Sequence, residues 1–481
     1  MPSRKVSAPA EPVTVDSRPA RVVIVALVVI GALVRLAGIG KDLWLDEVWS
    51  LRVATDLSSA WSAFTLHHEI NHHLNTLWLH ALGPNASAPL YHLLSYAFGV
   101  ATVGIAGAIG WRRGPLSGVA TAAAFALSYE MVLYSTEARG YSGLVFSTLL
   151  AFYALEPAIE TGGWQWRVLY WLACSLGVLS QPIFAGFLAA AIVWTALRAR
   201  MTGGGAGAVV RQLFRVHAVP VLVLGLLWFI DLRLVVAGGG TPASSLVGVY
   251  GGALAWAVGA VRSAGGELVS CVLVVAMVAS AIHAVRTADR GLSVFYLCAI
   301  VVFPIALVVV RGSDLVYTRH FLVAGIFTLL AFGFSVARWW TEGRKRLAVA
   351  SGAAFVIVNA FNVTTLARDG RGQYRDAIEY MAASAPGDSV TIAGDQDFRI
   401  GTEISYYLPR AETTKRLQYV DQRNWPVGGP DWIVMQNESW VVEPPEPELN
   451  LAGGFRYSLS KVFPTAPLSG LHWYLYHRAA R

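Results

Sequence analysis

Long apolar runs recur along the chain, separated by short polar segments. Most of these runs are close to twenty residues long, the length that an α-helix needs to cross the hydrocarbon core of a membrane. The pattern predicts eleven membrane spans, at residues 21–40, 89–110, 115–134, 140–158, 167–181, 182–198, 216–236, 266–285, 292–310, 318–337 and 347–366. The fifth and sixth are also compatible with one long helix broken at Gln181-Pro182, but their combined length favours two helices joined by a tight turn.

The pattern changes after residue 366. Residues 373–386 have the periodicity of an amphipathic helix, and short apolar runs at 389–394, 431–437 and 471–478 are typical of strands. This mixture predicts a small α/β domain outside the membrane. The chain then divides into a polar, Pro-rich flexible tail, a membrane domain and this α/β domain, at residues 1–20, 21–366 and 367–481.

Composition and charge support this division. Hydrophobic residues make up 55% of the chain and charged residues only 14%, against about 25% charged in ordinary globular proteins. The net charge of +7 does not indicate nucleic acid as a partner, because Lys and Arg lie between the apolar runs. They are concentrated in every second loop, which the positive-inside rule places in the cytoplasm. This orientation places Asp46, Glu47 and residues 367–481 on the outer side.

Four outer segments contain most of the reactive polar side chains. They are the loop 41–88 with its run "HHEINHHLN", the stretch "YSTEARGYS" (134–142), the stretch "RGSDLVYTRHF" (311–321), and the loop near 237–265 that follows Asp231 and Arg233. Charge near the depth of the bilayer costs several kcal/mol and is retained mainly where a polar cavity or a partner offsets it. The outer side is therefore where we expect a functional site.

Two of these stretches resemble a known family. "LWLDEVWS" (43–50) after the first span and "YSTEARGYS" after the third are similar to motifs of the polytopic glycosyltransferases of the GT-C fold, the lipid-linked-sugar-dependent enzymes that include protein O-mannosyltransferases and bacterial aminoarabinose transferases (glycosyltransferase family 39). The resemblance covers roughly residues 20–340 and implies a GT-C membrane domain in a bacterial inner membrane, with the C-terminal domain periplasmic or extracellular. Where many relatives have "HPPLYY", this chain has "SAPLYHLL" (87–94).

The resemblance also implies an activity. Such enzymes are hexosyl or pentosyl transferases that move a sugar from a polyprenyl-phosphate donor to an acceptor hydroxyl on the outer side. Direct, inverting displacement needs one carboxylate as base. The resemblance assigns this role to Asp46, and Glu47 would orient the acceptor or the neighbouring loop. The acceptor is a glycan, a lipid or a protein, and membrane lipids surround the enzyme.

The phosphate of the donor needs cationic side chains that can hold two oxygens, which favours Arg over Lys. Arg139, Arg319 and His320 lie at the outer membrane surface, although Arg139 can instead form a local ion pair with Glu137. Arg35, near the end of the first span, is expected to extend towards the same surface. The remaining residues that we expect in the acceptor cleft are Trp44, Glu137, Tyr141, Asn71, His72 and His73.

The histidine run raises the question of a metal. His68 and His72 have i, i+4 spacing, but the run is not HExxH and no third distant ligand is identifiable. The residues therefore predict no metal site and no organic cofactor, whereas the family resemblance leaves a divalent cation near the acids open.

Other classes of membrane protein remain as alternatives. A transporter or flippase has as many spans, but coupled transporters tend to place ionisable residues at the centres of their helices, where this chain has almost none. An enzyme like the O-antigen ligases, which also uses lipid-linked glycans, does not require the acidic pair. A receptor-like protein leaves both motifs unexplained.

Overall fold

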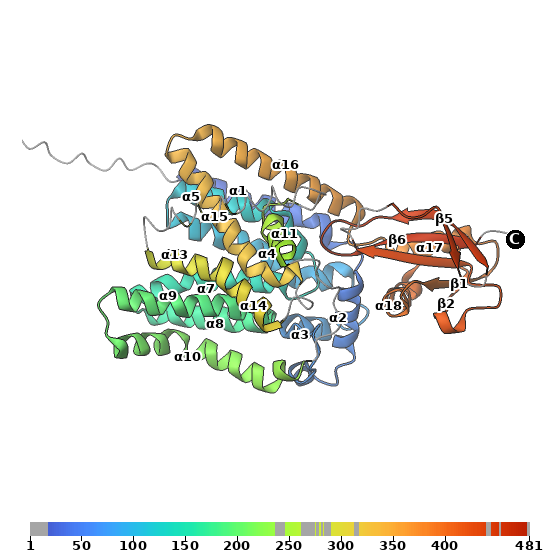
Figure 1. Cartoon of the computed structure of the whole chain (residues 1–481), viewed down its shortest axis with the longest axis horizontal. Helices are drawn as coiled ribbons and strands as arrows, with labels where there is room; N and C mark the ends of the chain where they lie inside the picture. The colour runs from blue at the N-terminus through green and yellow to red at the C-terminus, as the bar shows by residue number, and fades with distance from the viewer. Residues whose placement is uncertain are drawn as a thin grey trace, which may run out of the picture.

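A computed structural model of the chain consists of a helical region with a smaller sheet-containing domain at one end (Figure 1). The structure describes residues 18–235, 246–260, 290–311, 317–438, 444–451 and 454–478, with three isolated positions at 275, 279 and 282. The principal helices of the helical region are α1 Arg18–Ile39, α2 Leu45–Thr55, α3 His73–Leu82, α4 Ala88–Trp111, α5 Pro115–Leu127, α6 Tyr129–Tyr134, α7 Tyr141–Glu160, α8 Trp164–Ser180, α9 Ala185–Met201, α10 Ala206–Ile230, α11 Leu246–Ala257, α13 Arg290–Leu297, α14 Phe303–Arg311, α15 Leu322–Thr341 and α16 Lys345–Asp369.

Within the described residues, eight helical segments are long and apolar enough to cross a membrane, as expected of an integral membrane protein. They match eight of the eleven predicted spans. The eight segments are Arg18–Ile39, Ala88–Trp111, Tyr141–Glu160, Pro182–Met201, Ala206–Leu234, Gly291–Val310, Thr318–Thr341 and Lys345–Asp369. The predicted span 266–285 lies almost wholly outside the described residues.

The predicted span 115–134 is broken at Ser128 into α5 and α6. The Ser128 side chain accepts a hydrogen bond from Met131 N and begins the second helix. The break leaves carbonyl groups at the C-terminal end of α5 without helical partners. Arg35 on α1 donates to one of them, the carbonyl of Phe125, at 3.1 Å, and also to Ser135 Oγ at 3.0 Å. Arg35 is 0% exposed. The expectation that it extends to the membrane surface is therefore wrong, since these buried acceptors hold it inside.

The segment 167–198 forms two helices, as its length predicts. Helix α8 ends at Ser180, and Pro182 begins a short 3₁₀ turn before α9. Arg198 near the end of α9 pairs with Glu160, which precedes the start of α8. The two helices therefore run antiparallel, with the Gln181-Pro182 turn at the opposite end.

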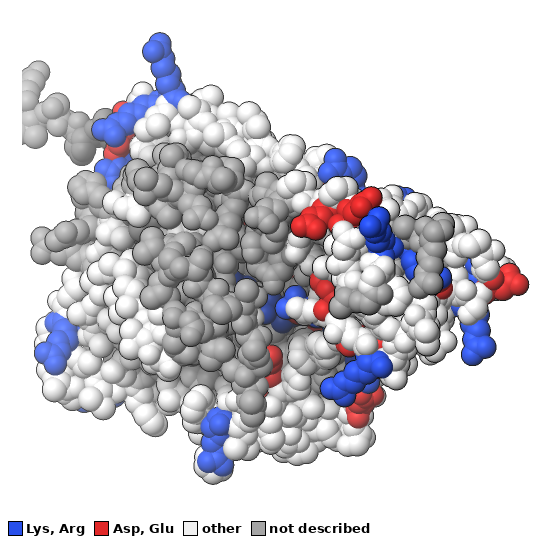
Figure 2. Space-filling model, turned by 45° about the vertical axis from the view of Figure 1, so that its right-hand side comes forward, with Lys and Arg blue, Asp and Glu red and all other residues white. Residues whose placement is uncertain are grey.

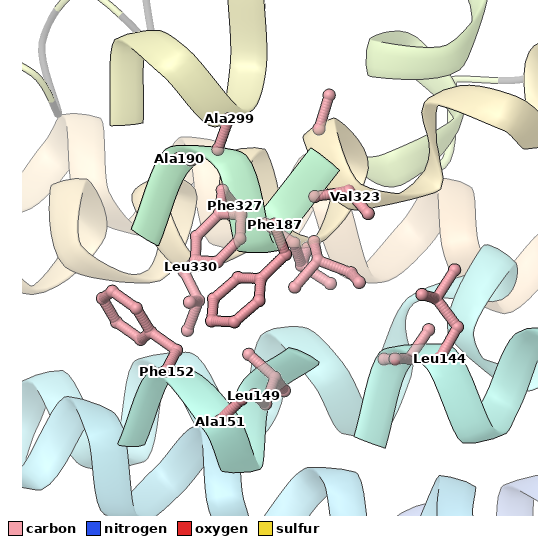
Figure 3. Packing of buried hydrophobic residues seen from close by; sticks show 14 of the residues in the cluster. Leu144, Leu149, Ala151, Phe152, Phe187, Ala190, Ala299, Val323, Phe327 and Leu330 are labelled. Carbon is pink, nitrogen blue, oxygen red and sulfur yellow. The ribbon is translucent and has the colours of Figure 1, made fainter. Parts of the chain in front are cut away.

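Charged side chains gather mostly at the two ends of the helical region and on the C-terminal domain (Figure 2). The described sides of the helical region are largely uncharged. This distribution fits helices whose sides face lipid. The centre of the region is a core of aromatic and aliphatic residues. Figure 3 shows side chains of α7, including Phe152, facing Phe187 of α9 and Phe327 of α15. The Phe187 and Phe327 rings stack with centroids 6.2 Å apart.

The C-terminal domain contains α17 Tyr374–Ser384, α18 Asp397–Tyr407 and a six-stranded sheet in the order β2-β1-β3-β6-β5-β4. Strand β1 pairs in parallel with β2 and β3, and the remaining pairs are antiparallel. The strands are β1 Ser389–Gly394, β2 Arg416–Tyr419, β3 Trp432–Glu438, β4 Glu448–Leu451, β5 Phe455–Phe463 and β6 Leu471–Arg478. The predicted amphipathic helix and all three predicted strands are present.

This domain packs against α2 and forms one hydrophobic core with it. Leu45, Val48 and Leu51 of α2 belong to the same buried cluster as Ile378 of α17 and Ile404 of α18. Tyr407 O–H donates to the carbonyl of Leu43 at 2.7 Å, and Arg410 donates to Pro84 O at 2.9 Å. The C-terminal domain thus lies at the end of the helical region where Asp46 is found.

Candidate functional site

Helix α2 exposes one face and buries the others. Its first turn is closed by Glu47, whose Oε2 accepts the backbone N–H of Trp44 at 3.2 Å. The apolar positions i, i+3 and i+6, beginning at Leu45, face the C-terminal domain. Asp46 and Trp49 lie on the more open side of the helix. The two adjacent acids therefore have different surroundings.

Asp46 meets two arginines from distant parts of the chain. Its Oδ2 accepts from Arg139 Nη1 at 2.7 Å and from Arg319 Nη1 at 3.2 Å. The Asp46 side chain is 16% exposed and that of Arg319 is 28% exposed. Among the described residues, no group donates a hydrogen bond to the second oxygen, Oδ1. The structure therefore brings three of the predicted site residues into direct contact, with one carboxylate oxygen left available.

Arg139 is held between aromatic rings and carboxylates. Its guanidinium lies 5.0 Å from the Tyr141 ring centroid and 5.9 Å from that of Trp44. Burial opposes its charge, but the nearby Tyr141 and Asp46 outweigh burial and raise the pKa of Arg139. Its contact with Glu137 is longer, at 3.6 Å. The closer ion pair of Arg139 is therefore with Asp46 and not with its neighbour in sequence.

Glu47 is fully buried, and its carboxylate accepts hydrogen bonds from several donors. Oε1 lies 2.8 Å from His92 Nε2 and 2.6 Å from Ala138 N. Burial favours the neutral acid, but the charges of His92 and Arg371 and these hydrogen bonds outweigh burial and lower the pKa of Glu47. Since Ala138 precedes Arg139, Glu47 anchors the loop that presents Arg139 to Asp46.

Glu137 faces Trp44. Its Oε1 accepts from Trp44 Nε1 at 3.1 Å, and its side chain is 1% exposed. Burial raises the pKa of Glu137 above its ordinary value, against the opposing charge of Arg139. Glu137 therefore fixes the ring of Trp44 beside the Arg139 guanidinium.

His72 supports the same loop from the other side. Its Nδ1 accepts the backbone N–H of Gly140 at 2.7 Å, so this nitrogen carries no proton. Burial, together with the charges of Arg139 and Arg319, holds the pKa of His72 well below its ordinary value. Gly140 is needed for space, because a Cβ there would lie 1.9 Å from the Ser180 carbonyl oxygen. His72 is therefore a neutral acceptor that positions the 137–140 loop.

Asn71 and His73 both contact Asp231 at the end of α10. His73 Nε2 is 2.8 Å from Asp231 Oδ2, and His67 Nδ1 is 2.9 Å from Oδ1. Asn71 donates to Ala63 O at 2.6 Å and to Asp231 Oδ2 at 3.4 Å. These two predicted cleft residues hold the first loop to the end of α10, and the structure does not place them beside Asp46.

His320 follows Arg319 on a short helical turn. Its Nδ1 accepts the backbone N–H of Tyr317 at 3.2 Å and so closes the short helical turn on which Arg319 sits. The structure therefore joins Arg139 and Arg319 to Asp46, and it places His320 as the support of the Arg319 turn.

Two residues that support the site were not predicted from the sequence. His92 bridges Glu47 and the carbonyl of Ile39, at 2.8 and 2.7 Å. Arg371 is 0% exposed and donates to Leu133 O and to Thr136 Oγ1 at 2.8 Å. His92 could have been suspected, because it is a histidine in the first turns of an apolar span, within the stretch that departs from the family's "HPPLYY". Arg371 lies just outside the last span, and nothing in the sequence around it indicated a role.

The acids of this site are arranged for contact with cations that the chain itself supplies. Asp46 accepts from two guanidinium groups, and Glu47 from an imidazole and backbone N–H groups. Within the described part of the chain, no three His, Cys, Asp or Glu side chains have an arrangement that fits a metal ion. Donors from the chain already bond to Asp46 Oδ2 and to both oxygens of Glu47, while Asp46 Oδ1 stays open.

The open side of this cluster faces solvent. Figure 2 shows oppositely charged side chains in a hollow where the helical region meets the C-terminal domain. In such a cluster the free carboxylate oxygen can accept a proton, and the two guanidinium groups can bind an anion. This combination is what transfer of a group from a phosphate ester requires.

Comparisons with known proteins give little guidance. No protein-family model matches the chain, and no curated protein matches it. Among solved structures, the chain is similar to the crystal structure of ArnT from Cupriavidus metallidurans bound to undecaprenyl phosphate, with 11% identity, 96% of this chain and 98% of that chain covered, and a TM-score of 0.49.

Proposed function

We propose that this protein is a membrane glycosyltransferase that moves a sugar from a polyprenyl-phosphate donor to an acceptor hydroxyl. The observation that carries the proposal is the contact of Asp46 with Arg139 and Arg319, at 2.7 and 3.2 Å, at one end of an apolar helical region. The family resemblance of the two motifs that contain Asp46 and Arg139 supports the same reaction. The proposal rests on these residues and not on overall structural likeness.

In the proposed reaction, the donor phosphate binds to the guanidinium groups of Arg139 and Arg319. Bidentate contacts between guanidinium and phosphate are strong and directional, and they stabilise the charge that develops on the leaving phosphate. The arginines would then share or release Asp46 Oδ2. A lipid-linked phosphate suits this position, since its head group lies at the membrane surface where the apolar helices end.

Asp46 would act as the base. As the acceptor oxygen attacks the anomeric carbon of the sugar, its proton moves to Asp46, and the bond between that carbon and the phosphate oxygen breaks with the electron pair staying on the phosphate. A single displacement inverts the configuration at the anomeric carbon. Glu47 and His72 take no part in bond making; they hold the loop that carries Arg139.

The distribution of basic loops supports an assignment of the side of the membrane. The positive-inside rule places Asp46 and the C-terminal domain outside the cytoplasm, and the two adjoin each other in the structure. We propose that the reaction takes place there and modifies a glycan, glycolipid or protein of the cell envelope. A phosphatase fused after Arg481 is expected to be active, and one fused near Arg200 silent; the reverse result would contradict this orientation.

The activity itself can be tested with purified full-length protein in lipid nanodiscs. Undecaprenyl-phosphate-linked hexose and pentose donors with a radiolabelled sugar are incubated with detergent-extracted envelope acceptors. Release of undecaprenyl phosphate with label in the acceptor fraction is expected, and the Asp46→Asn variant serves as the control for enzyme-dependent transfer. In a second assay the protein is reconstituted in sealed vesicles; if label crosses their bilayer while still attached to the lipid and none reaches the acceptor, the protein is a flippase and the proposal fails.

A further inference from the structure

A polar cavity lies at the end of the helical region opposite to Asp46. It has a volume of about 80 Å³ and is lined by Ile109, Arg112, Arg113, Phe152, Tyr153, Glu156, Trp194 and Leu292. His92, which contacts Glu47, and Ile109 are on the same helix, α4. A rise of about 1.5 Å per residue separates them by roughly 25 Å along its axis. The cavity is therefore distinct from the Asp46 site.

The two arginines at this cavity differ in how they are held. Arg112 donates to Tyr153 O at 2.7 Å, lies 3.8 Å from the Tyr153 ring centroid, and is 3.5 Å from Glu156. Arg113 lies 4.2 Å from the Phe334 ring centroid. No acid in the described part of the chain pairs with Arg113. The lining thus has two cations against one carboxylate, with one guanidinium available to an anion.

A buried donor adds to this positive lining. Trp194 is 1% exposed, and its indole N–H has no hydrogen-bond acceptor. Its ring is fixed by Phe295 and Phe152, at centroid distances of 5.6 and 6.2 Å. A buried N–H group without an acceptor is unfavourable and calls for an occupant that can accept its hydrogen bond. The cavity has room for several waters or one phosphate group.

We propose that this cavity binds the phosphate group of a membrane lipid, with Arg113 and Trp194 as its donors. Its mouth lies between the ends of α4, α7 and α9, which are apolar helices long enough to span a membrane. Basic pockets between membrane helices are known to bind lipid phosphate head groups. The site is independent of the proposed transfer reaction, since none of its lining residues contacts Asp46, Arg139 or Arg319.

The test is native mass spectrometry of delipidated full-length protein titrated with phosphatidylglycerol. Trp194→Phe removes only the unpartnered N–H, and Arg113→Gln removes the available charge; each is expected to weaken the tightest lipid-binding step about tenfold. Two matched controls are expected to bind like the wild type. Trp171→Phe removes an indole N–H that already donates to Val216 O at 2.8 Å, and Arg200→Gln removes an exposed charge outside the cavity.

Three results would overturn the proposal. Phosphatidylglycerol affinity that is unchanged in Trp194→Phe and Arg113→Gln would mean that the cavity holds only water. Equal losses in the two control variants would show that the effect is a general one of charge or packing. Binding of inorganic phosphate that is sensitive to Arg113→Gln, without binding of phosphatidylglycerol, would show that the ligand is a free anion and not a lipid.

Discussion

The open and buried faces of α2 carry adjacent acids in opposite surroundings. On the open face, Asp46 is 16% exposed and shares one oxygen with two arginines. On the buried face, Glu47 is 0% exposed and accepts hydrogen bonds from His92 and two backbone N–H groups. A carboxylate that is fully bonded inside the protein is suited to hold structure, and one with a free oxygen at a partly exposed position is suited to react.

A third acid shows that burial alone does not decide this role. Glu403 on α18 is also 0% exposed, but the nearby donors of Tyr374, Trp473 and the Leu45 backbone form no well-aligned hydrogen bond with its carboxyl oxygens and only partly offset burial. Burial raises the pKa of Glu403 to about 8, whereas the donors around Glu47 lower the pKa of that residue. The donors that reach a buried carboxyl group therefore determine whether it remains charged.

The largest effect is expected for Asp46→Asn. The variant keeps the shape of the side chain but cannot accept the proton of the acceptor, so kcat should fall by about 10²–10⁴-fold. The measurement is transfer from an undecaprenyl-phosphate sugar at matched protein concentration, with thermal unfolding in the same detergent as the control. Turnover equal to that of the wild type would remove Asp46 from the role of base and with it the difference between the two faces.

Glu47→Gln should instead act mainly on stability. The substitution leaves His92 buried opposite an uncharged amide, and breaking a buried ion pair in this way costs about 3 kcal/mol or more. We expect a larger loss of unfolding free energy than in Asp46→Asn and a smaller loss of kcat in the fraction that remains folded. If Glu47→Gln were as stable as the wild type but inactive, Glu47 would contact the substrate directly.

A substitution of Arg319 tests whether the arginines beside Asp46 bind the phosphate of the donor. Arg319→Gln should weaken binding of undecaprenyl phosphate about tenfold, because one hydrogen bond to a charged group is lost, with little change in the KM for the acceptor. Arg233→Gln is the matched control, since Arg233 is at the same end of the helical region and donates to Phe229 O. Unchanged lipid affinity in Arg319→Gln would place the phosphate elsewhere.

The sequence predicted the open face better than the buried one. Asp46, Arg139 and Arg319 were expected together because each lies in an outer loop next to a span, where topology alone brings them to one surface. The partners of Glu47 and His73 were not expected, because His92 and Asp231 lie within or at the end of apolar helices. Periodicity identifies such helices but does not show which residues face one another, so it gave no information about these pairs.

The same limit applies to the helices themselves. Eight predicted spans correspond to helices of spanning length, because hydrophobic length is a direct physical requirement of the bilayer. At the break of the third predicted span, Arg35 reaches across from α1 and donates to the carbonyl of Phe125 near the end of α5. A tertiary contact of this kind is not visible in the hydropathy of either segment.

The effect expected at Glu403 is on the pH dependence of stability and not on activity. This residue lies where the C-terminal domain packs on the buried face of α2. The unfolded chain releases this proton near the ordinary value of 4.5, while the folded protein retains it up to about pH 8. The folded state thus binds more protons in this window, so stability falls as pH rises from about 4.5 to about 8 and then levels off. Glu403→Gln, which stays neutral, should flatten the fall in unfolding free energy between pH 5 and 8, whereas Glu412→Gln, at an exposed position, should leave the slope unchanged. An unchanged slope in Glu403→Gln would mean that Glu403 is charged and paired in the folded protein, as Glu47 is, and the contrast between these two buried acids would disappear.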